Sequence, residues 1–164
     1  MRGGMRPLRF AAMFVAALAL GACARTGAEG GAGGGTALGS APAGSVQEFA
    51  ASVGDRIFFE TDSSQLTPQA IVTLDRQAQW LIRYQQHPIL IEGHADERGT
   101  REYNFALGAQ RAQAARDYLA SKGVTATRIR TTSYGKERPV AVCDDISCWS
   151  QNRRAVTALG GASS

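Results

Sequence analysis

No apolar run in the 164 residues reaches the roughly 20 residues that a membrane-spanning helix needs. This absence excludes an integral helical membrane protein. Aromatic residues make up only 7% of the chain, so the core has to be built from aliphatic and alanine side chains. The length suits one domain of about 100–150 residues and argues against two full cores.

Most of the excess of basic over acidic residues lies at the N-terminus. The formal net charge is +4, but three of the 18 basic residues, Arg2, Arg6 and Arg9, precede the first apolar stretch. Without residues 1–22 the chain keeps 15 basic against 14 acidic residues, a net charge of +1. Since nucleic-acid binding depends on a strong excess of basic residues, we expect no nucleic-acid partner.

Residues 1–22 are predicted to be a secretory signal peptide, because a basic stretch precedes a short apolar run and then small residues. The alternative is a buried N-terminal helix, but the stretch has no amphipathic face. Residues 20–23, Leu-Gly-Ala-Cys, resemble the lipobox of bacterial lipoproteins. This resemblance implies cleavage before Cys23 and lipidation of its sulfur. Ala24, where an Asp would signal retention, implies the outer membrane.

Residues 23–45 are rich in Gly, Ala, Ser and Thr and are predicted to be a flexible, lipid-anchored linker. Such a stretch cannot bury enough apolar surface to offset the entropy of ordering it. At 22 residues after the cysteine, its root-mean-square reach is about 25 Å. The folded domain is expected to cover residues 46–164.

Periodicity within residues 46–164 predicts strands that alternate with helices. Thr67 and Pro68 are a typical N-cap and first helical residue, and Gly123 is a typical helix stop. This alternation predicts a two-layer α/β sandwich. The predicted strands cover residues 56–59, 89–91, 128–134 and 155–159, and the predicted helices cover 67–86 and 102–122.

Asp96 and Arg111 are the most informative charged residues. Asp96 follows a predicted strand, where α/β proteins often bind ligands, and Arg111 lies in the apolar stripe of a helix. A partly buried Arg needs an anionic partner. One interpretation is that Asp96 and Arg111 pair with each other and fix the loop. The other is a site for a zwitterion, in which Asp96 binds an ammonium and Arg111 grips a carboxylate.

Five motifs resemble the OmpA-like peptidoglycan-binding domain family over about residues 57–159. They are Glu92-Gly-His-Ala-Asp-Glu-Arg-Gly-Thr100, Tyr103-Asn104, Leu107-Gly108-x-x-Arg111-Ala112, Ser133-Tyr-Gly-Lys-Glu137 and Asn152-Arg-Arg-Ala155. The resemblance implies an α+β fold, a mixed βαβαββ-type sheet backed by helices. The implied ligand is the diaminopimelate-containing stem peptide of peptidoglycan, which offers an amino group and a carboxylate on one carbon.

The resemblance also implies the site residues. The family's key Asp and Arg correspond to Asp96 and Arg111, and we expect substitution of either to abolish binding with little loss of thermal stability. Gly108 stands where many members have Ser, and Glu60 departs from the Phe-Asp-x-Asp loop that is usual in the family. Secondary contacts are expected from Asn104, Leu107, Phe59, Glu60 and Asp62. Arg153 either positions an anion or forms a structural ion pair.

Lipid-anchored members of this family partner TolB and act with other Tol proteins during outer-membrane constriction at division. The resemblance therefore implies the same partners here. Reversible binding suits a protein that exchanges between the cell wall and a protein partner. Two weak attachments joined by a short linker also benefit from a high effective concentration.

Cys143 and Cys148 are expected to form a disulfide, the default for two nearby cysteines in an exported protein. The alternative is a zinc site that adds His87 and His94. Cys-x-x-Cys spacing is absent and the histidines lie far away in sequence, so we predict no metal. His94 itself is expected to be a hydrogen-bonded structural residue.

The alternative function is a peptidoglycan hydrolase or metal-dependent amidase. Such an enzyme needs a nucleophile with its base, or three convergent metal ligands. The chain has no Gly-x-Ser-x-Gly and no His-Glu-x-x-His motif. We therefore predict a binding protein with no catalytic residues and no cofactor.

Overall fold

The computed structural model describes residues 41–160. The predicted signal peptide, Cys23 and most of the predicted linker lie outside this range. The described elements follow in chain order: α1 (Val46–Glu48), the π-helical turn η1 (Phe49–Gly54), β1 (Arg56–Phe58), α2 (Pro68–Arg83), β2 (Ile89–His94), α3 (Arg101–Ser121), the 3₁₀ turn η2 (Ala126–Arg128), β3 (Ile129–Gly135), α4 (Ile146–Asn152) and β4 (Arg154–Leu159).

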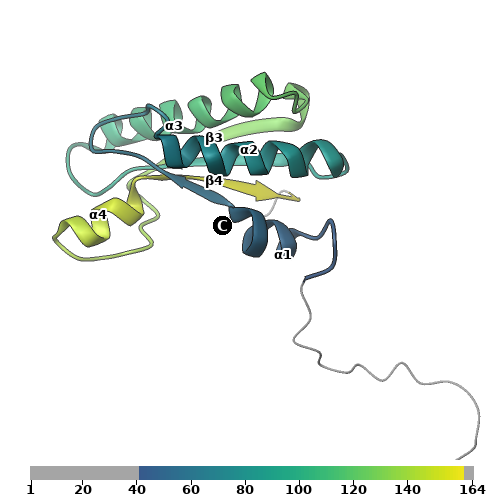
Figure 1. The fold of residues 1–164 in the computed structure, drawn as a ribbon. Coiled ribbons are helices and arrows are strands. Elements are labelled where there is room, and N and C mark those ends of the chain that lie inside the picture. The colour runs from purple at the N-terminus through teal and green to yellow at the C-terminus, as the bar shows by residue number, and fades with distance from the viewer. Residues whose placement is uncertain (1–40, 161–164) are drawn as a thin grey trace, which may run out of the picture. The chain divides into compact units, whose positions relative to one another are not determined.

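The four strands form one mixed sheet in the order β1-β4-β2-β3. β4 pairs antiparallel with β1 and β2, whereas β2 and β3 are parallel. Helices α2 and α3 lie side by side on one face of this sheet (Figure 1). The predicted α+β two-layer architecture with a mixed sheet is therefore confirmed. Within residues 41–160, no helix is both long and apolar enough to cross a bilayer.

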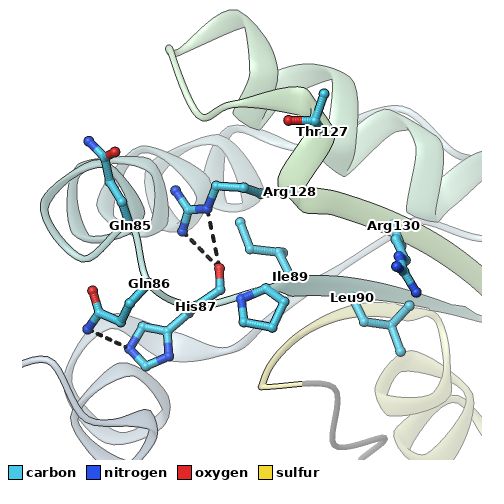
Figure 2. A pocket seen from close by; sticks show the side chains of 9 residues that line it. Gln85, Gln86, His87, Ile89, Leu90, Thr127, Arg128 and Arg130 are labelled. Carbon is cyan, nitrogen blue, oxygen red and sulfur yellow. Dashed lines mark hydrogen bonds between the residues drawn. The ribbon is translucent and has the colours of Figure 1, made fainter.

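Helix α2 begins as the sequence predicts. The hydroxyl of Thr67 accepts from the backbone N–H of Ala70 at 3.1 Å, and Pro68 occupies the first turn. The helix ends at Arg83, three residues earlier than predicted. Arg128 donates to the carbonyls of Leu81 and Tyr84 at the end of the helix and to that of His87 beyond it, so these carbonyls have a partner outside the helix. Figure 2 shows the bonds to the His87 carbonyl.

Helix α3 carries one buried stripe, which includes the predicted apolar stripe of Leu107, Arg111, Ala115 and Leu119. Thr100 caps its first turn by accepting from the N–H of Tyr103, and Gly123 follows its end with φ of +98°. The stripe packs against β2 and β3. Its buried residues are Asn104, Leu107, Gly108, Arg111, Ala112, Ala115 and Leu119.

Two helical segments were not predicted from the sequence. One is α1 with η1, where Phe49 packs against Trp80 and Glu48 accepts from the Trp80 indole at 2.9 Å. The turn before α1 also contacts the domain, since the Gly44 carbonyl lies 2.9 Å from the His87 ring. The folded domain thus includes a few residues assigned to the linker. The other segment is α4, whose short and largely polar sequence shows no helical periodicity.

Candidate ligand-binding site

A pocket of about 240 Å³ lies where β2 ends and α3 begins. The loop after β1 contributes Thr61 and Asp62, and the loop after β2 contributes Asp96 and Arg98. The pocket brings together five of the eight residues predicted to bind the ligand. Its full lining is Thr61, Asp62, Asp96, Arg98, Gly99, Tyr103, Asn104, Leu107 and Arg111.

Arg111 is completely buried and is held by backbone carbonyls. Its Nε donates to the Ser63 carbonyl at 2.9 Å, Nη1 to that of His94 at 2.8 Å and Nη2 to that of Glu60 at 3.1 Å. Burial lowers the pKa of Arg111 to about 10, partly opposed by the negative charge of Asp96. A guanidinium has five N–H groups, so these bonds leave one on each terminal nitrogen for a ligand.

The contacts of Arg111 decide against one of the two interpretations of the Asp96–Arg111 pair, and they also bear on the expected stability of a variant. In the part of the chain that the structure describes, Arg111 and Asp96 form no ion pair, because the Arg111 guanidinium donates hydrogen bonds to backbone carbonyls instead. Removal of Arg111 also cannot be neutral for stability, because it would leave three backbone carbonyls without this donor and open a space beside Phe59, whose ring centre lies 5.2 Å from the guanidinium carbon.

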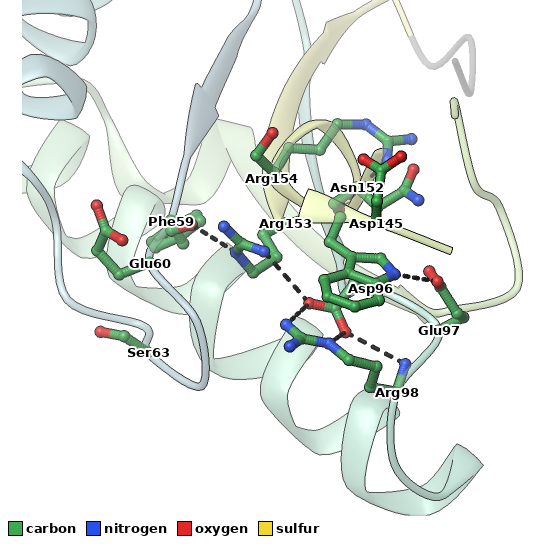
Figure 3. A network of polar contacts seen from close by, with 12 residues as sticks. Phe59, Glu60, Ser63, Asp96, Glu97, Arg98, Asp145, Asn152, Arg153 and Arg154 are labelled. Atoms are coloured by element: carbon green, nitrogen blue, oxygen red, sulfur yellow. Dashed lines mark hydrogen bonds and ion pairs between the residues drawn. The ribbon is translucent and has the colours of Figure 1, made fainter. Parts of the chain in front are cut away.

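Asp96 is 7% exposed and is held by two other arginines. Arg98 donates from Nη2 to Oδ2 at 2.7 Å and from Nε to Oδ1 at 3.1 Å (Figure 3). Nη1 of Arg153 lies 3.5 Å from Oδ2. Burial alone would raise the pKa of Asp96, but the hydrogen bonds and charge of Arg98, with the bond from Arg153, hold it below its usual value.

Arg153 forms an ion pair with Asp96, which is one of the two roles expected for it. Its side chain is buried, and its Nε donates to the carbonyl of Phe59 at 3.0 Å (Figure 3). Phe59, Glu60 and Arg153 line a neighbouring hollow of about 640 Å³ rather than the pocket around Asp96. Glu60 reaches the site only through its carbonyl, which accepts from Arg111.

The remaining predicted contacts lie around the rim and floor of the pocket. Asp62 adopts a left-handed backbone with φ of 55°, and its carboxylate accepts a hydrogen bond from the Tyr103 hydroxyl. Asn104 is buried, and its amide donates to the carbonyls of Arg98 at 2.7 Å and Thr100 at 3.0 Å. It therefore fixes the loop that carries Arg98. Leu107 supplies an apolar surface.

The cysteines and His94 do not line the pocket around Asp96. Cys143 and Cys148 are joined by a disulfide, with Cα atoms 5.6 Å apart. Residues 41–160 contain no group of three or more His, Cys, Asp or Glu side chains arranged to hold a metal ion. Neither ring nitrogen of buried His94 has a hydrogen-bond partner, contrary to expectation, and burial lowers its pKa to about 3.

Arg98 and Trp149 are the site residues that sequence reasoning missed. Arg98 lies in the motif of residues 92–100, two residues after Asp96. At this spacing the Arg98 side chain can fold back and pair with the Asp96 carboxylate. Trp149 lies in none of the motifs that predict the site. It lies in α4, and its ring centre is 4.1 Å from the guanidinium carbon of Arg98. No local pattern links these two residues, which are 51 positions apart.

The pocket offers carboxylates and guanidinium N–H groups side by side. A ligand that carries an ammonium and a carboxylate on neighbouring atoms matches both. The pocket lining includes no Ser, Cys, Lys or His side chain that could act as a nucleophile or general base, although Asp62 and Asp96 are acidic. The geometry favours recognition of a zwitterionic group.

Residues 58–153 match the model of the OmpA family. The peptidoglycan-associated lipoprotein of Mesorhizobium japonicum is 69% identical over 126 residues, which span 77% of this chain and 75% of that protein. The protein of the same name from Agrobacterium fabrum is 64% identical over 152 residues, 89% of this chain and 84% of that one.

Solved structures agree with these sequence matches. The peptidoglycan-associated lipoprotein of Burkholderia pseudomallei superposes with a TM-score of 0.64 at 41% identity, covering 67% of this chain and 95% of that one. The C-terminal domain of Helicobacter pylori MotB superposes with a TM-score of 0.60 at 22% identity, over 66% of this chain and 85% of that one. The second likeness shows a shared fold.

Proposed function

Because this chain belongs to the OmpA family, we propose that it binds peptidoglycan without cleaving it, through the pocket around Asp96 and Arg111. The observation that carries the proposal is one pocket of about 240 Å³ that holds Asp62, Asp96 and Arg111 together. Its opposite charges match a zwitterion. The chain is not an enzyme, as its relatives are named for peptidoglycan association and not for a reaction.

The ligand in this proposal is the diaminopimelate residue of the stem peptide. Its free amino group and carboxylate share one carbon atom, so one end of the residue presents both charges. Asp96 accepts from the ammonium, and the two remaining N–H groups of Arg111 donate to the carboxylate. Leu107 packs against the aliphatic part of the ligand, while Asn104 keeps the loop between Asp96 and α3 in place.

The N-terminal region supplies the second attachment. Residues 1–22 act as the signal peptide, Cys23 carries the lipid that holds the chain in the outer membrane, and residues 23–45 link it to the periplasmic domain. The linker keeps the domain at high effective concentration near the wall, so modest affinity suffices. The chain thereby tethers the outer membrane and exchanges with TolB as part of the Tol system during division.

The test is a sacculus pull-down with the full-length chain in detergent. Asp96→Ala should lower the bound fraction at least tenfold, as expected for loss of one partner of a desolvated charged contact. Asp117→Ala is the matched control, because the Asp117 side chain is 63% exposed and lies near the C-terminal end of α3, whereas the pocket lies at the N-terminal end. Equal pull-down of the Asp96 variant and the control would overturn the site, and release of soluble muropeptides would overturn the non-enzymatic function.

The anchor has its own test. Cys23→Ser removes the sulfur that would carry the lipid, so the variant should leave the outer-membrane fraction and collect in the soluble periplasmic fraction. Persistence of the variant in outer-membrane vesicles stripped of peptidoglycan would contradict lipid anchoring while leaving the binding pocket untouched.

A further inference from the structure

The carboxylate of Asp96 has no acceptor site left for a ligand. Oδ1 accepts from the backbone N–H of Arg98 at 3.2 Å and from its Nε at 3.1 Å. Oδ2 accepts from Nη2 of Arg98 at 2.7 Å and from Nη1 of Arg153 at 3.5 Å. A carboxylate has about four lone-pair sites, so a ligand ammonium can bind only if one of these donors leaves.

Of the two arginines, Arg98 is the one that can leave. The Arg153 side chain is only 6% exposed and is tied to the Phe59 carbonyl, which lies in another segment of the chain. The Arg98 side chain is 41% exposed and comes from the loop that lines the pocket. Figure 3 shows both guanidinium groups converging on Asp96. A guanidinium this exposed can turn into solvent, and the ammonium of the ligand then takes its place beside the carboxylate.

The position of Arg98 is supported from the opposite side by α4. The Trp149 ring centre lies 4.1 Å from the guanidinium carbon, at cation–π distance. The indole N–H donates to the carboxylate of Glu97, the residue between Asp96 and Arg98. Trp149 follows Cys148 directly, so the disulfide with Cys143 fixes the helix that carries it. Arg98 therefore has a defined place when no ligand is present.

A nearly buried carboxylate needs a cation nearby, because an unpaired charge in such surroundings is costly. We propose that the Arg98 side chain is a displaceable cap, which occupies Asp96 in the free protein and gives way to the cationic group of the ligand. This inference rests on the proposed function of the pocket. It makes the site selective for ligands that carry both charges, since a ligand with carboxylates alone cannot replace the guanidinium and reaches only Arg111.

The experiment compares two small probes with the full-length chain in detergent, by NMR titration. One probe is meso-diaminopimelate, and the other is pimelate, which has the same carbon chain and carboxylates but no amino groups. Arg98→Ala should bind meso-diaminopimelate about fivefold more tightly than the wild type, the scale of one exposed ion pair. It should bind pimelate no more tightly, because that probe has no cation for the exposed carboxylate.

Arg101→Ala is the matched control. It removes the same charge three residues along the chain, but Arg101 pairs with Glu137 at 3.0 Å, its side chain is 72% exposed, and it lines a different pocket. The backbone N–H of Arg98 remains in the Arg98→Ala variant and still donates to Asp96, so the loop keeps that bond. If Arg98→Ala binds meso-diaminopimelate no more tightly than Arg101→Ala does, the cap is overturned.

A measurement without ligand separates the cap from the proposed function. The carboxylate carbon signal of Asp96 should titrate at higher pH in Arg98→Ala than in the wild type, because two side-chain hydrogen bonds are lost. An unchanged titration would overturn the cap even if sacculi still bind. If neither the wild type nor Arg98→Ala binds meso-diaminopimelate or sacculi while the titration shifts as expected, the proposed function fails, and the ion pair survives only as a structural contact.

Discussion

Gly93 of β2 and Gly108 of α3 pack with their backbones in direct contact. A Cβ atom on Gly93 would overlap the carbonyl oxygen of Gly108, and a Cβ on Gly108 would overlap the hydroxyl of Ser133 and lie 2.9 Å from the Gly93 carbonyl oxygen. Gly108 is three residues before Arg111 on the same buried stripe. This close approach of α3 to the sheet therefore places the Arg111 guanidinium within hydrogen-bond distance of the loop carbonyls.

Gly93→Ala should be strongly destabilising, by about 3 kcal/mol or more, because the added methyl group meets backbone and not a movable side chain. Gly108→Ala should also destabilise, chiefly through Ser133. The free energy of unfolding in urea measures both. Gly108→Ala combined with Ser133→Ala should recover part of the loss, since one of the two clashes is then removed. A double variant no more stable than Gly108→Ala would contradict this packing.

Arg111→Ala should lower the free energy of unfolding by about 3 kcal/mol, because three carbonyl groups lose a donor inside the protein. Arg111→Lys keeps the charge but cannot donate to all three, so it should recover only part of the loss. Urea unfolding is the measurement, and the exposed Arg101→Ala should stay within about 0.5 kcal/mol of the wild type. An Arg111→Ala variant as stable as the wild type would be inconsistent with these contacts.

Stability should fall in acid partly through Asp96. Its pKa is lowered in the folded protein, so its contribution is fully present above its unfolded pKa and is lost as pH falls through the folded pKa. The stability difference between the wild type and Asp96→Asn should be constant from about pH 5 to 8 and shrink below about pH 4. Urea unfolding across this range tests the sign. A difference that grows in acid would show that the pKa is raised instead.

The disulfide should stabilise the segment that carries Trp149 and Arg153. Cys143 and Cys148 are five positions apart, and for so small a loop the chain-entropy contribution is about 2 kcal/mol. Replacing both cysteines with Ser should lower the free energy of unfolding by up to this amount. Amide exchange should also quicken at Val140 and Ala141, which donate to the Asn152 side chain. Unchanged exchange at these amides would show that the disulfide does not hold the segment.

Local patterns in the sequence were enough to predict most of the fold. The Thr67-Pro68 start of α2, the buried stripe of α3 and the stop at Gly123 are all present, because caps, periodicity and glycine act over a few neighbouring residues. Helix α4 was missed for the converse reason. Its seven residues are held by side-chain contacts to the preceding loop, such as that of Asn152 with Ala141, and by the disulfide, and these leave no helical periodicity in the sequence.

The sequence alone singled out Asp96 and Arg111, at the end of a strand and on the buried face of a helix, but it did not single out Arg98. Only the tertiary structure decided their partners. Arg111 binds carbonyls that lie 17 to 51 positions away, and Asp96 is shared between a neighbour and Arg153, 57 positions away. The fold decides which backbone carbonyl oxygens are buried without a donor. A guanidinium nearby then donates its N–H groups to those oxygens.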